Sequence, residues 1–449
     1  MSGLLAVGSL CTVINSFISF LKGDNMKILL MSAGSRGDIE QFLAIEELLR
    51  DKGHEVVCAF PDEFKNLVDE SNARFVSLGS ANADLLESEN SKMFMGGKGS
   101  IFKKIPAFVR GIKESGEASK ELFVKGHRII EGENPDRILF NWVANYPIIW
   151  GMDNPDKSIL VSPAPCYIHY VKNHTDMFFH GNNYGSFLNK LTYALANSLL
   201  IVLMGRHYNG IDNDEVVKIT KKITLKQIYT ALLSTKIIYA ISPSIFPRPD
   251  YWPGNAHVWG YHERDKTLNW DVDEDLNRFI SKHDKVLLVT FGSMTNPEPE
   301  ENTEIFLDVL QKHQIPAVIN TASGGLIEPA EYDPDLIHFV KYVPYDWILP
   351  RVYGVIHHGG SGTTHTALKY GCSSMIIPHI VDQYVWNSIV SDLGAGPKGI
   401  GMSKLTKRNL ELKLLDLFQN PAYKAKAMRI SEKMKKEDFR EEFYKAIMG

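Results

Sequence analysis

Two stretches of the sequence open in the same way. "KILLMSAG" runs from Lys27 to Gly34, and "KVLLVTFG" runs from Lys285 to Gly292. In each stretch a lysine precedes a short apolar run that ends at a glycine, which is the pattern of a buried strand followed by a tight turn. This repeat constrains the fold strongly, because it predicts the start of a parallel α/β unit twice in one chain.

Further apolar runs follow each opening and alternate with segments of helical pattern. Short apolar strands separated by helices are typical of parallel sheets with helices on both faces. We therefore expect an α/β protein in which two doubly wound, Rossmann-like domains face each other across a cleft. The expected strands after the two openings are residues 55–60, 74–78, 137–142, 158–163, 316–321, 338–343, 353–358 and 373–378.

The domain limits follow from length and composition. A chain of 449 residues is too long for one ordinary core. Four prolines and two glycines between Ser242 and Asp265 predict an irregular connection. The expected order is an apolar or amphipathic extension (1–25), a first domain (26–245), a linker (246–265), a second domain (266–430) and a C-terminal helix (431–449).

The first 25 residues differ from the rest of the chain. "SGLLAVGSLCTVINSFISFL", from Ser2 to Leu21, carries no charge, and on a helix its apolar residues share one side. A spanning helix would be apolar all round, and a secretory signal would begin with positive charge. Two interpretations stay open: a helix that lies on a membrane surface, or an extension without a membrane role.

Charge and cysteine content exclude some classes of protein. The chain has 49 Lys and Arg against 53 Asp and Glu, a net charge of -4, which argues against a nucleic-acid partner. The four cysteines have no metal-ligand or redox-motif spacing, so free thiols in a reducing compartment are expected. We therefore expect a cytoplasmic protein, peripheral at a membrane if the leading segment binds one.

The stretch "YGVIHHGGSGTTHTALKYG", from Tyr353 to Gly371, predicts an anion site. It reads as a strand, a glycine-rich turn and a helix whose free backbone N–H groups face the turn. Glycines in the turn let a phosphate approach the backbone, and His358 is placed to donate a hydrogen bond to it. No lysine follows in a GxxxxGK pattern, so this is not an ATP-binding P-loop. Asp382 and Gln383 follow the next strand, where ligands bind in open α/β sheets.

The spacing of the histidines in the sequence predicts no metal site. His357 and His358 are adjacent in a predicted strand, and such neighbours point to opposite faces. His169, His174 and His180 lie in an irregular polar stretch without a carboxylate pattern, and we expect them to be loop residues near the mouth of an acceptor site. No metal site is therefore expected from these histidines.

These motifs resemble those of glycosyltransferase family 1, whose members have the GT-B fold. "HHGGSGTT" followed by a proline, "DQ" and a tryptophan resembles the donor signature of the branch that includes sterol glucosyltransferases and glycopeptide-antibiotic glycosyltransferases. "GSRGDIEQFLAI", from Gly34 to Ile45, resembles the opening of that branch. The resemblance covers roughly residues 26–406 and is thinnest between 82 and 239.

The resemblance implies roles for individual residues. Asp38 corresponds to the general base that takes the proton from the acceptor hydroxyl, and a helix N-terminus favours its ionised form. By this resemblance, the pyrophosphate is bound by the turn after His358 and by the turn that ends the second-domain opening strand. A backbone group binds the edge of the base, and the "DQ" pair binds the sugar. The corresponding donor-binding residues are Gly292, Ser293, Val343, His358, Gly360, Gly362, Thr363, Asp382 and Gln383.

The sequence departs from the family at some positions. Gln41 stands where the branch usually has proline, and Thr366 stands eight residues after His358, where plant members place a ribose-binding glutamate. Tyr342 and Tyr345 replace the residues that flank the base there. The sterol branch also lacks that glutamate, so the departures bear on the choice between UDP and dTDP and not on the family.

The expected function is an inverting, metal-independent transfer of a hexose from a nucleotide sugar to a hydroxyl. The favoured donor is UDP-glucose and the favoured acceptor is a sterol or another lipid. The alternatives are a glycosyltransferase of a polyketide, peptide or phenolic product, and a non-catalytic protein that binds nucleotide sugars. A nicotinamide dehydrogenase is disfavoured, because the first turn lacks GxGxxG and no acid ends the strand at 55–60.

Overall fold

The computed structural model describes most of the chain. The described residues are 25–80, 118–209, 222–264, 270–271, 273–292, 294, 296, 298–322 and 324–449. The leading segment, residues 1–24, lies outside them, so both interpretations of that segment stay predictions.

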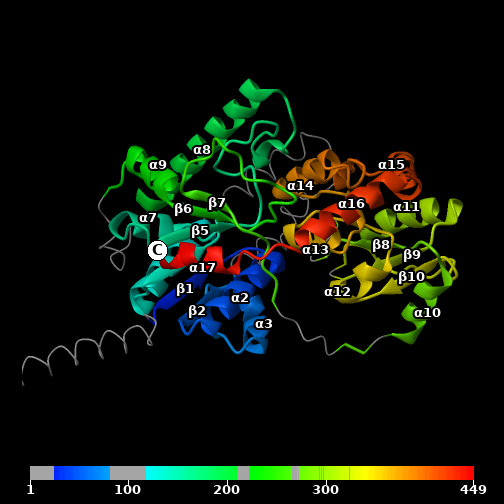
Figure 1. The fold of residues 1–449 in the computed structure, drawn as a ribbon, viewed down its shortest axis with the longest axis horizontal. Coiled ribbons are helices and arrows are strands. Elements are labelled where there is room, and N and C mark those ends of the chain that lie inside the picture. The colour runs from blue at the N-terminus through cyan, green and yellow to red at the C-terminus, as the bar shows by residue number, and fades with distance from the viewer. Residues whose placement is uncertain are drawn as a thin grey trace, which may run out of the picture.

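The first sheet has seven strands, all parallel, in the order β3-β2-β1-β4-β5-β6-β7 (Figure 1). The strands are β1 (Lys27–Met31), β2 (Glu55–Phe60), β3 (Arg74–Ser77), β4 (Arg137–Phe140), β5 (Ser158–Ser162), β6 (Lys236–Tyr239) and β7 (Ala256–Val258). The helices described in this half are α2 (Arg36–Asp51), α3 (Lys65–Glu70), α7 (Tyr146–Asp153), α8 (Ser186–Asn209) and α9 (Leu225–Ser234), with a short 3-10 turn, η2, at Met177–Phe179.

The second sheet has five parallel strands in the order β10-β9-β8-β11-β12. Its strands are β8 (Leu287–Thr290), β9 (Ala317–Asn320), β10 (Ile337–Val340), β11 (Gly354–His357) and β12 (Ser373–Ile376). Its helices are α10 (Glu274–Lys282), α11 (Pro299–Lys312), α12 (Tyr345–Ile348), α13 (Ser361–Lys369), α14 (Val381–Asp392), α15 (Lys407–Gln419) and α16 (Pro421–Met434).

The strand order places the two expected ligand turns. In each sheet the chain runs outward from the first strand and then returns to its other side, so the order reverses between β1 and β4 and between β8 and β11. Ligands of open α/β sheets bind at such switch points, beyond the carboxyl ends of the strands. The predicted fold class, two doubly wound parallel-sheet domains, is confirmed.

The segment expected to be an irregular linker differs from the prediction. Ala256–Val258 forms β7 and pairs with β6, so the first sheet extends into it. Pro249 and Pro253 precede this short strand, and Gly260 follows it at φ 73°. The composition that predicted a connection therefore marks the two ends of an edge strand, where prolines and glycines are tolerated.

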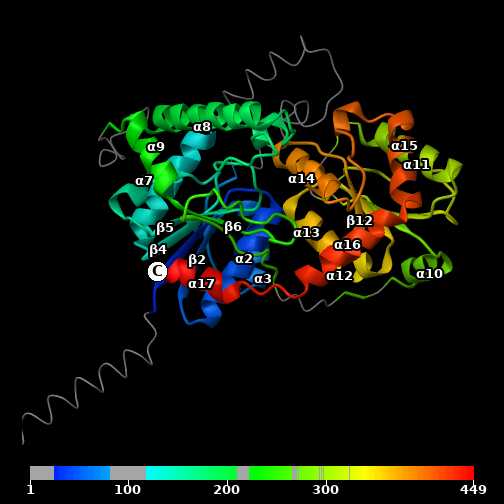
Figure 2. The same cartoon turned by 45° about the horizontal axis from the view of Figure 1, so that its top comes forward.

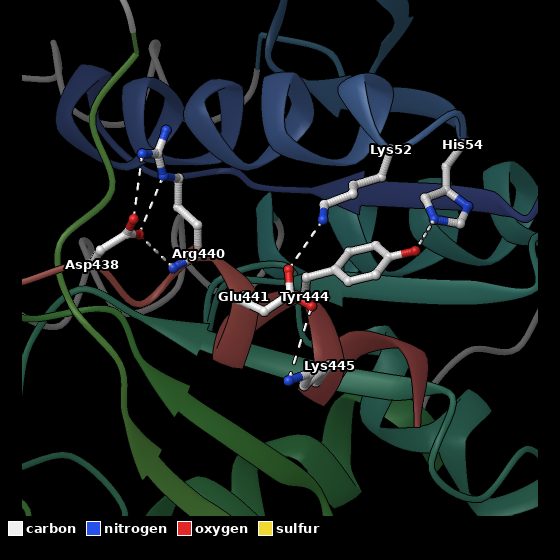
Figure 3. Close-up of polar contacts among 7 residues, drawn as sticks. All are labelled: Lys52, His54, Asp438, Arg440, Glu441, Tyr444 and Lys445. Atoms are coloured by element: carbon white, nitrogen blue, oxygen red, sulfur yellow. Dashed lines mark hydrogen bonds and ion pairs between the residues drawn. The ribbon is translucent and has the colours of Figure 1, made fainter. Parts of the chain in front are cut away.

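The C-terminal helix α17 (Arg440–Met448) packs on the first domain and not on the second (Figure 3). Phe443 and Ile447 are fully buried in a cluster that includes Ile28 of β1. Around them, Tyr444 Oη lies 2.9 Å from His54 Nε2, and Lys52 Nζ lies 3.0 Å from a Glu441 carboxylate oxygen. The buried residues of α17 thus close the chain back over its first strand.

Candidate functional site

Asp38 lies in the first turn of α2, directly after the turn that follows β1. Its Oδ2 accepts hydrogen bonds from the backbone N–H of Ser35 at 2.7 Å and from the Ser35 hydroxyl at 2.9 Å. Gly34 makes room for this arrangement, because a Cβ there would overlap the Asp38 carboxylate. The turn is tied to the neighbouring strand by the Ala33 N–H, which donates to Asn141 Oδ1 at 3.3 Å.

The protonation of Asp38 differs from the expectation. Burial raises the pKa of Asp38, and the hydrogen bonds from Ser35 oppose that rise without cancelling it. The helix N-terminus alone had suggested a carboxylate held strongly ionised. A raised pKa makes the carboxylate a stronger base, which suits a group that must accept a proton near neutral pH.

Asp382 faces Asp38 from the second domain. It lies in the first turn of α14, and burial, reinforced by the negative charge of Asp38, raises its pKa to about 7. A charge on one domain that perturbs a carboxyl on the other requires the two groups to be close across the cleft. The structure therefore brings together the predicted base and one of the two predicted sugar-binding residues.

The domains also meet through buried contacts beside these acids. The backbone N–H of Ser242 donates to His365 Nε2 at 3.1 Å, and the Tyr261 ring stacks on His365 with centroids 4.5 Å apart. A second contact joins the domains: His180 of the first domain stacks on Tyr384 of α14, with ring centroids 4.1 Å apart. These contacts fix the orientation of α13 and α14 relative to α2.

His358 occupies a pocket bounded by glycines at the end of β11. It is 8% exposed, and burial lowers its pKa to about 4, so its ring is neutral at pH 7. A Cβ at Gly360 would overlap the ring, and a Cβ at Gly292 would lie 3.1 Å from it. The buried Nδ1 has no hydrogen-bond partner within the described part of the chain. A neutral imidazole still offers one N–H donor to an anion.

The N-terminus of α13 lies next to this ring. Gly360 is its N-cap, and Gly362 and Thr363 lie in its first turn. Their backbone N–H groups are unsatisfied within the helix and create the positive end at which anions bind. The Tyr345 hydroxyl, which also lies 3.0 Å from Thr290 Oγ1, is hydrogen-bonded to Thr363. This places His358, Gly360, Gly362, Thr363 and Gly292 together; Ser293 lies outside the described residues.

Gln383 has a more limited role than predicted. Its Oε1 accepts hydrogen bonds from the backbone N–H groups of His379 at 2.8 Å and Ile380 at 3.2 Å, so it holds the turn before α14. Only its NH₂ group is left to donate to a sugar hydroxyl. Trp386, three residues after Gln383 on α14, is fully buried, with its ring centroid 5.1 Å from that of His365, and belongs to the core.

Val343 and Thr366 mark the other end of the predicted donor site. The Val343 side chain is buried among the residues under α12, so only its backbone is oriented for recognition of a base. Thr366 Oγ1 lies 3.3 Å from a carboxylate oxygen of Glu263, which also pairs with Lys369. Sequence reasoning missed Glu263, because it reaches α13 from the connection between the domains and no local pattern marks it.

His169 and His174, two of the histidines expected in a loop, make polar contacts with neighbouring groups. His169 Nδ1 lies 2.9 Å from the Tyr239 hydroxyl, and His174 Nδ1 lies 3.0 Å from the Gly181 carbonyl oxygen. Among the described residues, no three His, Cys, Asp or Glu side chains gather as metal ligands. Cys58, Cys166 and Cys372 are buried free thiols.

We expect Asp382→Asn to stabilise the unliganded protein above pH 7. A carboxyl whose pKa rises to about 7 on folding keeps its proton between about pH 4 and 7 while the unfolded chain releases it. Its contribution to the free energy of unfolding therefore falls as pH rises through that window, by on the order of 2 kcal/mol after allowance for partial solvent screening. Between pH 4 and 8, the melting temperature of the variant should rise increasingly above that of the wild type. A lower melting temperature at pH 8 would contradict this electrostatic picture.

Part of the chain matches a known protein family. Residues 317–448 match the family "Erythromycin biosynthesis protein CIII-like, C-terminal domain". The matched part is less than half of the chain. It contains β11, α13 and α14, and therefore the glycine-rich turn, His358 and the Asp382–Gln383 pair.

Curated relatives extend the similarity to both domains. The sterol 3-beta-glucosyltransferase UGT80A2 of Arabidopsis thaliana is 27% identical over 433 residues, which cover 92% of this chain and 64% of the relative. The sterol 3-beta-glucosyltransferase of Saccharomyces cerevisiae (strain YJM789) is 26% identical over 431 residues, 91% of this chain and 34% of the relative. The chain thus spans less than two thirds of either protein.

Solved structures share the whole architecture. The glycotransferase of kitacinnamycin covers 92% of this chain and 95% of its own with a TM-score of 0.63 at 17% identity. The calicheamicin glycosyltransferase CalG4 covers 95% and 98% with a TM-score of 0.61 at 14% identity. At such identities the likeness establishes the fold, which is GT-B.

Proposed function

We propose that this protein transfers glucose from UDP-glucose to the hydroxyl of a sterol or another apolar lipid, with inversion at the anomeric carbon. The observation that carries the proposal is the position of Asp38, which faces the donor-side helices α13 and α14 across the cleft and perturbs Asp382. The sterol 3-beta-glucosyltransferases that resemble the chain over both domains support the acceptor class.

In this mechanism the groups on the two domains have separate tasks. The Asp38 carboxylate accepts the proton of the acceptor hydroxyl while the acceptor oxygen attacks C1 of the sugar. The bond from C1 to the diphosphate oxygen breaks on the opposite side, so a single displacement inverts the anomeric centre. The leaving diphosphate gains negative charge, which the N-terminus of α13 and an N–H of His358 are placed to stabilise.

In this proposal, different elements of the donor site bind the sugar and the nucleotide. We propose that Asp382 accepts hydrogen bonds from sugar hydroxyls and that the Gln383 NH₂ group donates one. We propose that the base is bound beside Val343, and that charge stabilisation by the protein lets the reaction proceed without a metal ion or a cofactor. The proposed location is cytoplasmic, at the surface of a membrane that presents the acceptor.

The test is a product assay on the whole chain. Purified protein is incubated with UDP-glucose, dTDP-glucose or UDP-galactose and with a sterol dispersed in detergent, with and without EDTA. Mass spectrometry identifies the glycosylated product, and proton NMR of the anomeric centre reports its configuration. We expect a β-glucoside of the sterol from UDP-glucose, unchanged by EDTA.

Other outcomes of this assay would support the alternative functions. Transfer to phenolic or polyketide acceptors but not to sterols would indicate a natural-product glycosyltransferase; the glycosyltransferases of kitacinnamycin and calicheamicin share this fold. Nucleotide-sugar binding without transfer to any acceptor would indicate a non-catalytic binding protein.

A further inference from the structure

The outer face of α8 is apolar where a surface helix is normally polar. Phe187 is 81% exposed and Leu199 is 61% exposed, and both belong to one row along the helix. A surface helix ordinarily turns its apolar side inward and its charged side to water. We call this row the α8 face; its residues are Phe187, Leu188, Leu191, Leu195, Leu199 and Leu203.

The opposite side of α8 is anchored in the first domain. Tyr193, Ile201 and Met204 are buried in the main core cluster of that domain. Ser186–Arg206 is long and apolar enough to cross a membrane by length and composition, but this inner side already packs on the fold. The helix therefore lies along the surface, and Figure 2 shows it across the upper edge of the first domain with α9 at one end.

The charges beside the α8 face are positive. Lys190 and Arg206 of α8 and Lys226 of α9 are exposed, and neither helix contains Asp or Glu. The loop that joins them, residues 210–221, carries both signs of charge and lies outside the described residues. α9 adds exposed Leu225 and Tyr229 next to the C-terminal part of α8. Exposed leucines on two helices whose charged residues are all Lys or Arg match the surface of an anionic bilayer.

The α8 face begins at the candidate site. η2 and the residues just before α8 pack on α14: His180 stacks on Tyr384, and the Gly181 backbone contacts Val385. α14 is the helix that carries Asp382. A surface bound along α8 would therefore lie next to the cleft at its acceptor side.

We propose that the α8 face binds the surface of an anionic lipid bilayer, with its leucines in the headgroup boundary and Lys190, Arg206 and Lys226 at the lipid phosphates. The binding itself follows from the exposed residues. Its use, to bring the cleft to an acceptor in the membrane, rests on the proposed function.

Vesicle co-sedimentation of the full chain tests the proposal. The double variant Leu195→Gln/Leu199→Gln keeps good helix-forming residues but removes apolar area from the α8 face. We expect it to partition at least about tenfold more weakly than the wild type onto phosphatidylcholine vesicles containing phosphatidylserine. The matched control is Leu412→Gln/Met428→Gln, two exposed apolar residues on α15 and α16 of the other domain, which should partition like the wild type.

Three results would overturn the proposal. Equal partitioning of the double variant and the wild type would show that another surface binds lipid. A melting temperature clearly lower than that of the control variant would show that a segment of the chain itself covers the α8 face. A change from dimer to monomer on gel filtration, without a change in vesicle binding, would assign the face to a second copy.

Transfer to a short-chain acceptor in detergent separates this proposal from the proposed function. We expect the double variant to retain that activity, because none of its substituted residues belongs to the candidate site. Vesicle binding that depends on the α8 face in a protein without transferase activity would support the membrane surface and contradict the proposed function.

Discussion

Replacing Asp38 with asparagine is expected to lower the rate of glycosyl transfer by about 10²- to 10⁴-fold while leaving nucleotide-sugar affinity nearly unchanged. Asparagine keeps a side-chain oxygen that accepts the Ser35 N–H, so the helix cap is retained. It cannot take the proton from the acceptor hydroxyl. The measurement is steady-state kinetics on a detergent-dispersed sterol, with calorimetric titration of UDP-glucose alongside.

A matched control separates catalysis from capping. Asp273 caps α10 in the second domain by accepting from the backbone N–H groups of Asp275 and Leu276. Asp273→Asn makes the same chemical change in a capping carboxylate outside the candidate site, so its stability should stay close to that of Asp38→Asn while its activity stays at the wild-type level. Wild-type turnover in Asp38→Asn would show that Asp38 only caps the helix, and it would contradict the proposed mechanism.

Replacing His358 with alanine should weaken the binding of both UDP and UDP-glucose by about 10- to 100-fold. A hydrogen bond to a charged group contributes about 1.5–3 kcal/mol, and the His358 N–H is placed to meet the diphosphate, which the two ligands share. Calorimetry with both ligands measures the loss. His358→Gln, whose side-chain NH₂ can take the place of the ring N–H, should restore part of the affinity.

The same titration distinguishes sugar from phosphate recognition. Asp382→Asn should weaken the binding of UDP-glucose and spare that of UDP, because in the proposed mechanism Asp382 contacts only the sugar. Gln383 is a poorer probe, since its Oε1 also holds the turn before α14 and its loss would disturb the fold. An equal loss for both ligands in Asp382→Asn would contradict the placement of the sugar.

Local pattern in the sequence predicted the strands, the glycine-rich turns and the helix starts. The runs "KILLM" and "YGVIHH" became β1 and β11 with the turns after them, because apolar alternation, glycine conformations and helix capping act over a few neighbouring residues. The motif that resembled glycosyltransferase family 1 lies in the domain that the family comparison matched. These features needed no knowledge of distant contacts.

Only the tertiary structure decided which distant groups meet and which surfaces stay uncovered. Asp38 and Asp382 are far apart in the chain, and the effect of Asp38 on the pKa of Asp382 depends on how the two sheets face each other. Glu263 reaches Thr366, and α17 closes over β1, through contacts that no local pattern encodes. Apolar residues such as the leucines of α8 ordinarily predict burial. Several of them stay exposed, because only the opposite side of α8, with Tyr193, Ile201 and Met204, packs on the first domain.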